Sequence, residues 1–162
     1  MFSFLKKKDT KTVYIQSICD GQIISITKVP DKMFANKLLG DGIGFEFNGD
    51  TIYAPCDGNI VLVSKTNHAI GMKLKNNAEI LIHVGMDTVH LNGKGLKPLV
   101  KVGNRVKVGQ PILEIDREVM NDHHICLTTP LILTNGVDYD IKLLRNDGKI
   151  DLGEMVLTIS KK

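Results

Sequence analysis

The chain has no tryptophan, and its 162 residues include only three tyrosines and five phenylalanines. Its three cysteines, Cys19, Cys56 and Cys126, are widely spaced and form no CxxC pair, which argues against a disulfide framework; we expect three small buried thiols in a reduced, cytoplasmic protein. No stretch approaches the roughly 20 apolar residues of a membrane span, and no signal-peptide core is present. The balance of 21 basic and 18 acidic residues, with scattered lysines, argues against a nucleic-acid-binding protein.

What the chain does have is 43% hydrophobic residues and 15 glycines, which indicate an aliphatic core with many tight turns. Its length suits one compact domain. We predict a single domain over residues 13–162 and a flexible leader over residues 1–12. Within that leader, Phe2, Phe4 and Leu5 come before Lys6, Lys7 and Lys8, so weak contact of residues 1–8 with an anionic membrane surface is a second interpretation.

Short strand-like segments separated by turn signals predict an all-β fold, an antiparallel β-sandwich or barrel-sandwich hybrid with one or two short helices. The expected helices are Lys32–Leu39, capped by Asp31 and stopped by Gly40, and Arg117–Asp122. The expected strands are Gly21–Ile26, Gly42–Phe47, Thr51–Ala54, Gly58–Ser64, Ala69–Lys75, Ala78–Val84, Arg105–Val108, Pro111–Ile115, Ile125–Leu127, Leu131–Thr134, Ile141–Leu144 and Met155–Ile159.

Two histidines flank one predicted hairpin. Its arms, Ala69–Lys75 and Ala78–Val84, are joined by a two-residue turn at Asn76-Asn77, since asparagine tolerates left-handed backbone angles. In that register Ile70 faces His83, and His68 and His83 become diagonal neighbours on one face. Two imidazoles that converge on one small object are the chemistry this sequence offers.

The strand before His83 shows which side is open. Ile80, Ile82 and Val84 alternate with Leu81, His83 and Gly85, so the branched aliphatics face the core and His83 faces outward. Gly85 leaves space beside the ring.

The other polar candidates are weaker. Thr66 could orient His68 through its hydroxyl. Asp31 and Asp87, taken alone, are a helix cap and a turn residue. His123 and His124 point to opposite faces if extended, and no further ligand follows at a suggestive spacing, so we treat them and His90 as structural.

Five motifs are dispersed along the chain. They are VPDKMFANKLLGDGIGF from Val29, APCDGNI from Ala54, TNHAIGM from Thr66, LIHVGMDTVHLNGKGL from Leu81 and VKVGQPILEID from Val106. Together they resemble the glucose-family IIA component of the phosphoenolpyruvate-dependent sugar phosphotransferase system. The resemblance runs from about Val13 to Ile159 and is most specific around His83.

The resemblance implies the fold and a set of roles. His83 is the expected phospho-acceptor, His68 its partner that stabilises the phosphoryl group, and Thr66 the support of His68. Asp31 and Asp87 are expected to meet arginines of partner proteins, and backbone N–H groups at Gly85 and Asp87 to contact the phosphoryl group. We expect an apolar docking rim made of Met33, Phe34, Leu39, Leu81 and Val89.

The implied partners are the phosphohistidine carrier protein, the cytosolic domain of a membrane sugar permease, and regulatory targets. Where several relatives carry aromatic residues in the rim, this chain has Ser64, Gly71 and Leu81. That departure concerns the range of partners and leaves the histidine pair untouched.

Three alternatives involve other chemistry. A zinc peptidase of related fold is suggested by His83-x-x-x-Asp87, but the H-x-H half of that metal motif is absent. A biotin or lipoate carrier is suggested by Gly71-Met72-Lys73, although Lys73 lies inside a predicted strand rather than at a hairpin tip. No cofactor or metal is required for phosphoryl transfer between histidines, but zinc could be bound jointly by His68, His83 and a partner's carboxylate.

Overall fold

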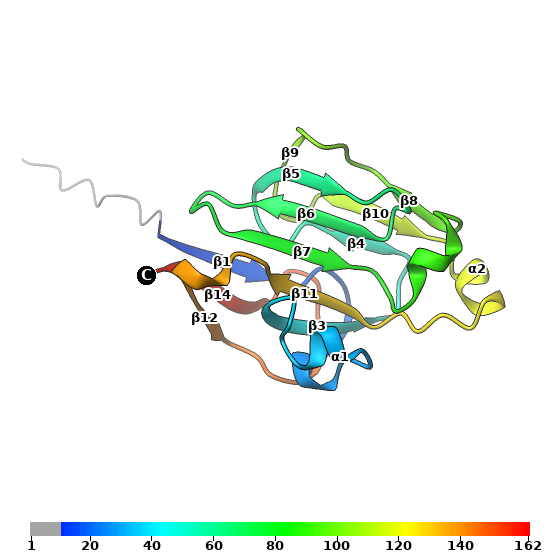
Figure 1. The fold of residues 1–162 in the computed structure, drawn as a ribbon, viewed down its shortest axis with the longest axis horizontal. Coiled ribbons are helices and arrows are strands. Elements are labelled where there is room, and N and C mark those ends of the chain that lie inside the picture. Colours follow the sequence, from blue (N-terminus) through cyan, green and yellow to red (C-terminus); the bar gives the residue numbers. More distant parts are fainter. Residues whose placement is uncertain (1–10) are drawn as a thin grey trace, which may run out of the picture.

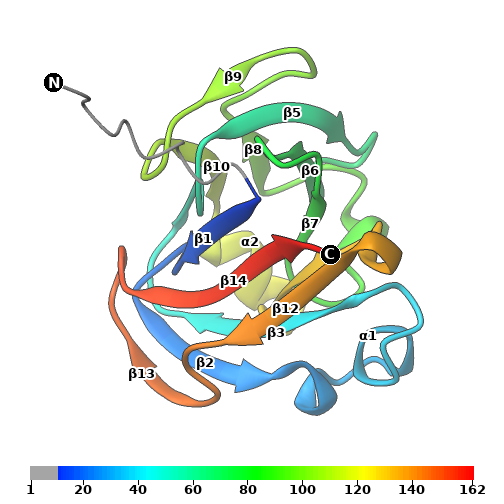
Figure 2. The ribbon, with the colours of Figure 1, turned by 90° about the vertical axis from the view of Figure 1, so that its left-hand side faces the viewer.

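In a computed structural model that describes residues 11–162, short antiparallel strands form three sheets (Figures 1 and 2). The strands are β1 (Thr12–Gln16), β2 (Gly21–Ser25), β3 (Asp41–Phe47), β4 (Thr51–Tyr53), β5 (Gly58–Val63), β6 (Ala69–Lys73), β7 (Glu79–His83), β8 (Leu96–Pro98), β9 (Arg105–Val106), β10 (Pro111–Ile115), β11 (Thr129–Leu133), β12 (Tyr139–Leu143), β13 (Gly148–Ile150) and β14 (Met155–Lys161). The helices are α1 (Lys32–Ala35) and α2 (Arg117–Asp122). This architecture confirms the predicted all-β sandwich with two short helices.

The largest sheet carries the hairpin. It has eight strands in the order β13-β2-β3-β11-β7-β6-β5-β9, and the two smaller sheets have the orders β1-β14-β12 and β4-β10-β8. The inward faces of the three sheets share one core of branched aliphatic side chains, among them Ile15, Ile43, Ile60, Ile82 and Ile112, each at most 1% exposed. Burial of this surface is the main force that holds the sheets together.

The structure corrects several predicted elements. Helix α1 ends at Ala35 rather than Leu39, because Lys37 adopts a left-handed backbone (φ 57°) that helical hydrogen bonding cannot continue. The predicted strand Ile125–Leu127 is irregular chain. Strands β1, β8 and β13 were not predicted, and Thr12, assigned to the leader, begins β1. The rest of the predicted leader, residues 1–10, lies outside the described residues.

None of the helices within residues 11–162 is both long and apolar enough to cross a membrane.

Candidate functional site

His83 is the last residue of β7 and lies on the outward face of the large sheet. Ile80 and Ile82 of the same strand are buried in the core, whereas Leu81 and His83 are partly exposed, as the alternation predicted. The chain then leaves regular strand geometry, because Gly85 and Asp87 both have positive φ (70° and 58°).

The predicted register of the hairpin is wrong by one residue. His83 pairs with Ala69, and Ile70 pairs with Ile82, because the turn contains three residues rather than two. Asn76 sets this turn: its side-chain amide donates to the carbonyls of Lys11 and Ile159, and its Oδ1 accepts from the Ala78 N–H. The buried Asn76 therefore belongs to the contact between the turn and β14, and Asn77 (φ 66°) completes the reversal.

The two imidazoles nevertheless lie together. Their ring centroids are 4.9 Å apart, with the planes at 72°. A regular strand in this register would send the rings to opposite faces. His68, however, precedes β6 and follows Asn67, whose left-handed backbone (φ 63°) takes the chain out of strand geometry. The His68 carbonyl still accepts from the Val84 N–H at 2.7 Å. The predicted proximity is therefore present, but it comes from the irregular backbone before β6.

One hydrogen bond defines the tautomer of His83. Its Nδ1 lies 2.9 Å from the carbonyl oxygen of Gly85. A carbonyl can only accept, so Nδ1 carries the proton, and in the neutral ring the lone pair is on Nε2. The unprotonated nitrogen of His83 is thus the one directed away from its own backbone.

His68 is held by two hydroxyls. Thr66 Oγ1 lies 2.6 Å from His68 Nδ1, as the sequence predicted, and Ser64 Oγ lies 3.2 Å from the same nitrogen. Ser64 Oγ also accepts from the Ala69 N–H, so it is part of the turn that presents His68. We did not predict this role for Ser64; its only sequence signal was a small polar residue four positions before the histidine.

Phe34 packs against the ring of His83. The ring centroids of Phe34 and His83 are 5.1 Å apart, and Phe34 is 3% exposed within a small apolar cluster with Ile26, Val29, Met86 and Ile132. The prediction that Phe34 belongs to an exposed docking rim is therefore wrong, because its side chain is needed inside to pack α1 against the sheet.

The other predicted rim residues divide in two. Met33 and Val89 are exposed and Leu81 is half-buried beside this cluster. Leu39 is also exposed, but it borders a different hollow with Leu133 and Thr134. This hollow lies where the end of β11 pairs with the start of β7, whereas His83 is at the other end of β7. Leu39 is thus set apart from the ring pair.

Two carboxylates flank His83. Asp31 caps α1, with Oδ1 accepting from the Met33 N–H at 2.8 Å, as predicted. Asp31 and Asp87 are both near enough for their negative charges to act on the pKa of His83. Of the two predicted backbone contacts, the Gly85 N–H is already used by Thr129 Oγ1 at 3.2 Å, which contradicts its prediction. Within residues 11–162 the Asp87 N–H has no acceptor.

Both histidines have lowered pKa values. Burial is the main cause for each; the charge of His83 adds to the lowering at His68, while the Gly85 carbonyl and the two carboxylates oppose the lowering at His83. Both rings are therefore neutral at pH 7, since even an unperturbed histidine has a pKa of about 6.5.

We expect NMR titration of the two rings to give midpoints below that of a histidine in an unfolded peptide, about 6.5. Because the folded-state pKa values are lowered, the unfolded chain binds more protons in acid. The stability contributed by the neutral rings is complete above about pH 6.5 and is lost as the pH falls further. Midpoints at or above that of the peptide would contradict the burial argument.

The remaining candidates lie elsewhere. His123 is the C-cap residue after α2, His124 follows with φ 53°, and His90 is on a 3₁₀ turn (Thr88–Leu91). Cys19 and Cys56 are buried, and burial raises the pKa of each thiol to about 12, but Cys126 is exposed, which corrects its prediction. Across the part of the chain that the structure describes, no three His, Cys, Asp or Glu side chains gather into a metal-binding group.

Comparison with known proteins gives two findings. Residues 13–139 match the model of a family described as "phosphoenolpyruvate-dependent sugar phosphotransferase system, EIIA 1". Among solved structures, the chain is similar to the glucose permease IIA from Mycoplasma capricolum, with 29% sequence identity and a TM-score of 0.85 over 98% of this chain and 99% of that one.

Proposed function

This chain belongs to the EIIA 1 family of the phosphoenolpyruvate-dependent sugar phosphotransferase system, and on that premise we propose that it carries a phosphoryl group on Nε2 of His83. His83 accepts the group from the phosphohistidine carrier protein and passes it to a cysteine of the membrane sugar permease. The observation that carries this assignment is the ring pair: His83 with its free Nε2, and His68 beside it at 4.9 Å.

The bond from His83 Nδ1 to the Gly85 carbonyl suits both directions of transfer. When Nε2 attacks, a P–N bond forms on His83 as the P–N bond of the donor histidine breaks. The Nδ1 proton stays on the ring throughout. In the onward step the permease thiolate attacks phosphorus, and His83 leaves as a neutral imidazole, so no proton has to move on this chain.

His68 serves the phosphoryl oxygens. If the Thr66 hydroxyl donates to His68 Nδ1, the proton of the neutral ring is on Nε2, where it can donate to a phosphoryl oxygen. Phosphoryl transfer passes through a loose transition state in which alignment and stabilisation of the equatorial oxygens provide most of the catalysis. The Asp87 N–H is a second candidate donor, and no metal is needed for either step.

The surroundings suit a protein partner. Exposed Met33 and Val89, with half-buried Leu81, offer apolar contact near His83, and Asp31 and Asp87 offer negative charge for a cationic residue of the partner. Zinc bound between the histidines and a partner's carboxylate stays a prediction.

The test is to locate the phosphate. Incubation with phosphoenolpyruvate and the two general proteins of the system is expected to label the chain with acid-labile phosphate on His83, identified by mass spectrometry under neutral conditions. Phosphate on any other residue would remove the proposal.

The two hydroxyls that contact His68 Nδ1 are expected to affect onward transfer to different extents. Thr66→Ala is expected to slow onward transfer about tenfold and Ser64→Ala about threefold, as befits hydrogen bonds of roughly 0.5–1.5 kcal/mol and the shorter Thr66 contact. Thr66→Ser, which keeps the hydroxyl, should restore most of the rate. Rapid-quench transfer rates and the NMR tautomer of His68 measure the effect; unchanged rates in both alanine variants would show that the hydroxyls do not act through His68.

A further inference from the structure

A basic groove lies at the end of the β6–β7 hairpin remote from the histidines. It encloses about 370 Å³ and is lined by four cationic side chains, Lys73, Lys75, Arg105 and Lys107. Strand register builds part of it: Asn59 of β5 pairs with Lys73 of β6 on one side and with Arg105 of β9 on the other. Paired residues share one face of a sheet, so two of the cations flank Asn59 in a row across three strands.

The four cations are not neutralised by neighbouring groups. All are exposed, and the ion pairs found within residues 11–162, Lys37–Asp41 and Arg145–Glu154, involve none of them. The acidic residue in the lining, Asp57, uses Oδ1 to accept from the Val108 N–H at 2.8 Å. Glu79 is opposite Lys73 in the register but lies beyond ion-pair distance. The groove therefore keeps a net positive charge.

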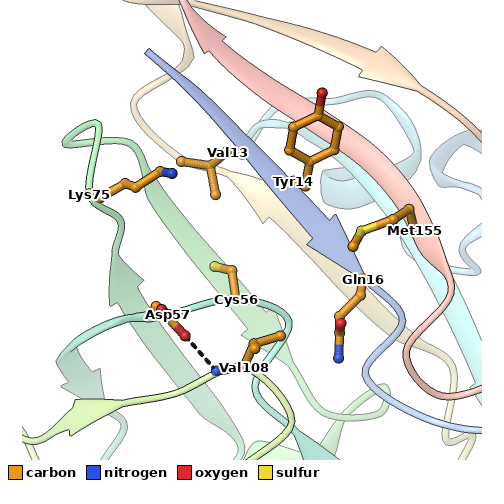
Figure 3. Close-up of a pocket in the computed structure, with 8 residues that line it drawn as sticks. All are labelled: Val13, Tyr14, Gln16, Cys56, Asp57, Lys75, Val108 and Met155. Atoms are coloured by element: carbon orange, nitrogen blue, oxygen red, sulfur yellow. Dashed lines mark hydrogen bonds between the residues drawn. The ribbon is translucent and has the colours of Figure 1, made fainter. Parts of the chain in front are cut away.

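An apolar hollow of about 250 Å³ adjoins this groove and shares Asp57 and Lys75 with it (Figure 3). Its rim includes three large exposed side chains: Tyr14 of β1 (58%), Val108 (48%) and Met155 of β14 (47%). Figure 3 shows Lys75 extending toward Val13 at the edge of this hollow. Cations and exposed apolar groups thus meet on a single face.

We propose that this face, formed by the basic groove and the apolar rim, docks on the surface of an anionic lipid bilayer. Lysine and arginine near such a surface are attracted to its phosphates, while exposed apolar side chains, tyrosine especially, are favoured at the interface. A purely basic groove would suit any polyanion, but the adjoining apolar rim favours a membrane.

The position of the face supports this orientation. Figure 1 shows β6 and β7 running in opposite directions, with the end of β7 on the side of α2 and the β6–β7 turn on the side where β1 begins. His83 ends β7, whereas Lys75 lies in the turn. A protein resting on the membrane by the turn end therefore keeps the histidine end open for protein partners.

The experiment measures cosedimentation of the full chain with vesicles of 30% phosphatidylglycerol and 70% phosphatidylcholine at low salt. Each cation is expected to contribute roughly fivefold to partitioning. The pair Lys75→Gln with Lys107→Gln should therefore weaken binding about 25-fold. A matched pair, Lys28→Gln with Lys149→Gln, removes the same charge from exposed sites elsewhere and should change binding less than twofold. Tyr14→Ser, added to the Lys75→Gln and Lys107→Gln pair, should weaken vesicle binding by a further few-fold.

Several outcomes would overturn the proposal. The first is an equal loss of vesicle binding in the two lysine pairs, and the second is equal binding to vesicles of pure phosphatidylcholine. The third is that substitution of Lys6, Lys7 and Lys8 alone accounts for the whole loss of binding. The fourth is displacement from the vesicles by inorganic phosphate at constant ionic strength. Labelling of His83 by the upstream carrier is measured on the same variants and should be unchanged. Failure of vesicle binding is thereby separated from failure of the phosphocarrier assignment.

Discussion

Replacement of His83 by glutamine is expected to abolish phosphorylation of this chain, with labelling from phosphoenolpyruvate and the two general proteins falling to background. Glutamine keeps the size and polarity of the site but has no nitrogen lone pair that can attack phosphorus. The other histidines are not expected to substitute. In the proposed tautomer of His68 the lone pair is on Nδ1, which is engaged with Thr66 and Ser64, and Nε2 carries the proton; the remaining three histidines lie outside the ring pair. The measurement is acid-labile phosphate per chain after a fixed incubation.

The matched control is His90→Gln, which removes an exposed histidine of the neighbouring 3₁₀ turn. It should label as fast and as fully as the unaltered protein. Equal thermal unfolding of the two variants would establish that His83→Gln is folded. Full labelling of folded His83→Gln would end the assignment of the phospho-acceptor.

Replacement of His68 by glutamine is expected to have a different effect: the chain still accepts phosphate, but onward transfer to the permease slows by about 10²–10³-fold, the usual cost of losing one positioned donor at a developing charge. The nucleophile is unaffected, since the Gly85 carbonyl rather than His68 sets the His83 tautomer. The amide of the substituted glutamine can still donate a hydrogen bond to a phosphoryl oxygen, but Thr66 and Ser64 no longer hold it in a fixed orientation.

Single-turnover transfer from the isolated phosphorylated protein to the permease domain separates the two steps. A ratio of onward rate to acceptance rate that is the same in His68→Gln and in the unaltered protein would rule out the proposed role of His68. The NMR tautomer of His83 provides a structural check: it should stay protonated on Nδ1 in His68→Gln, because the Gly85 carbonyl sets it.

The hairpin shows where sequence reasoning succeeded and where it failed. Alternation of branched aliphatics placed His83 on the open face correctly, because a strand with Ile80 and Ile82 in the core has only one other side. The two-residue turn was wrong. The sequence contained a correcting signal: Ile70 and Met72 are as apolar as Ile80 and Ile82, and only a three-residue turn pairs all four toward the core.

The site shows the same division. Asp31 as a helix cap and Thr66 as the partner of His68 follow from short-range spacing, since both contacts span two residues. The contact of Phe34 with the His83 ring and the hydrogen bond from the Gly85 N–H to Thr129 depend on segments that are far apart along the chain. No local pattern specifies such contacts.

The amino-acid sequence by itself determined the all-β class, the outward face of His83 and the family motifs, because strand periodicity and turn chemistry act over a few residues. Tertiary structure holds the three-residue turn in place, through the Asn76 amide that donates to β14, and it alone decided the burial of Phe34 against His83. It also brought Lys73 and Arg105 to either side of Asn59. These features follow from long-range pairing and packing, whose partners are chosen only when the whole core is assembled.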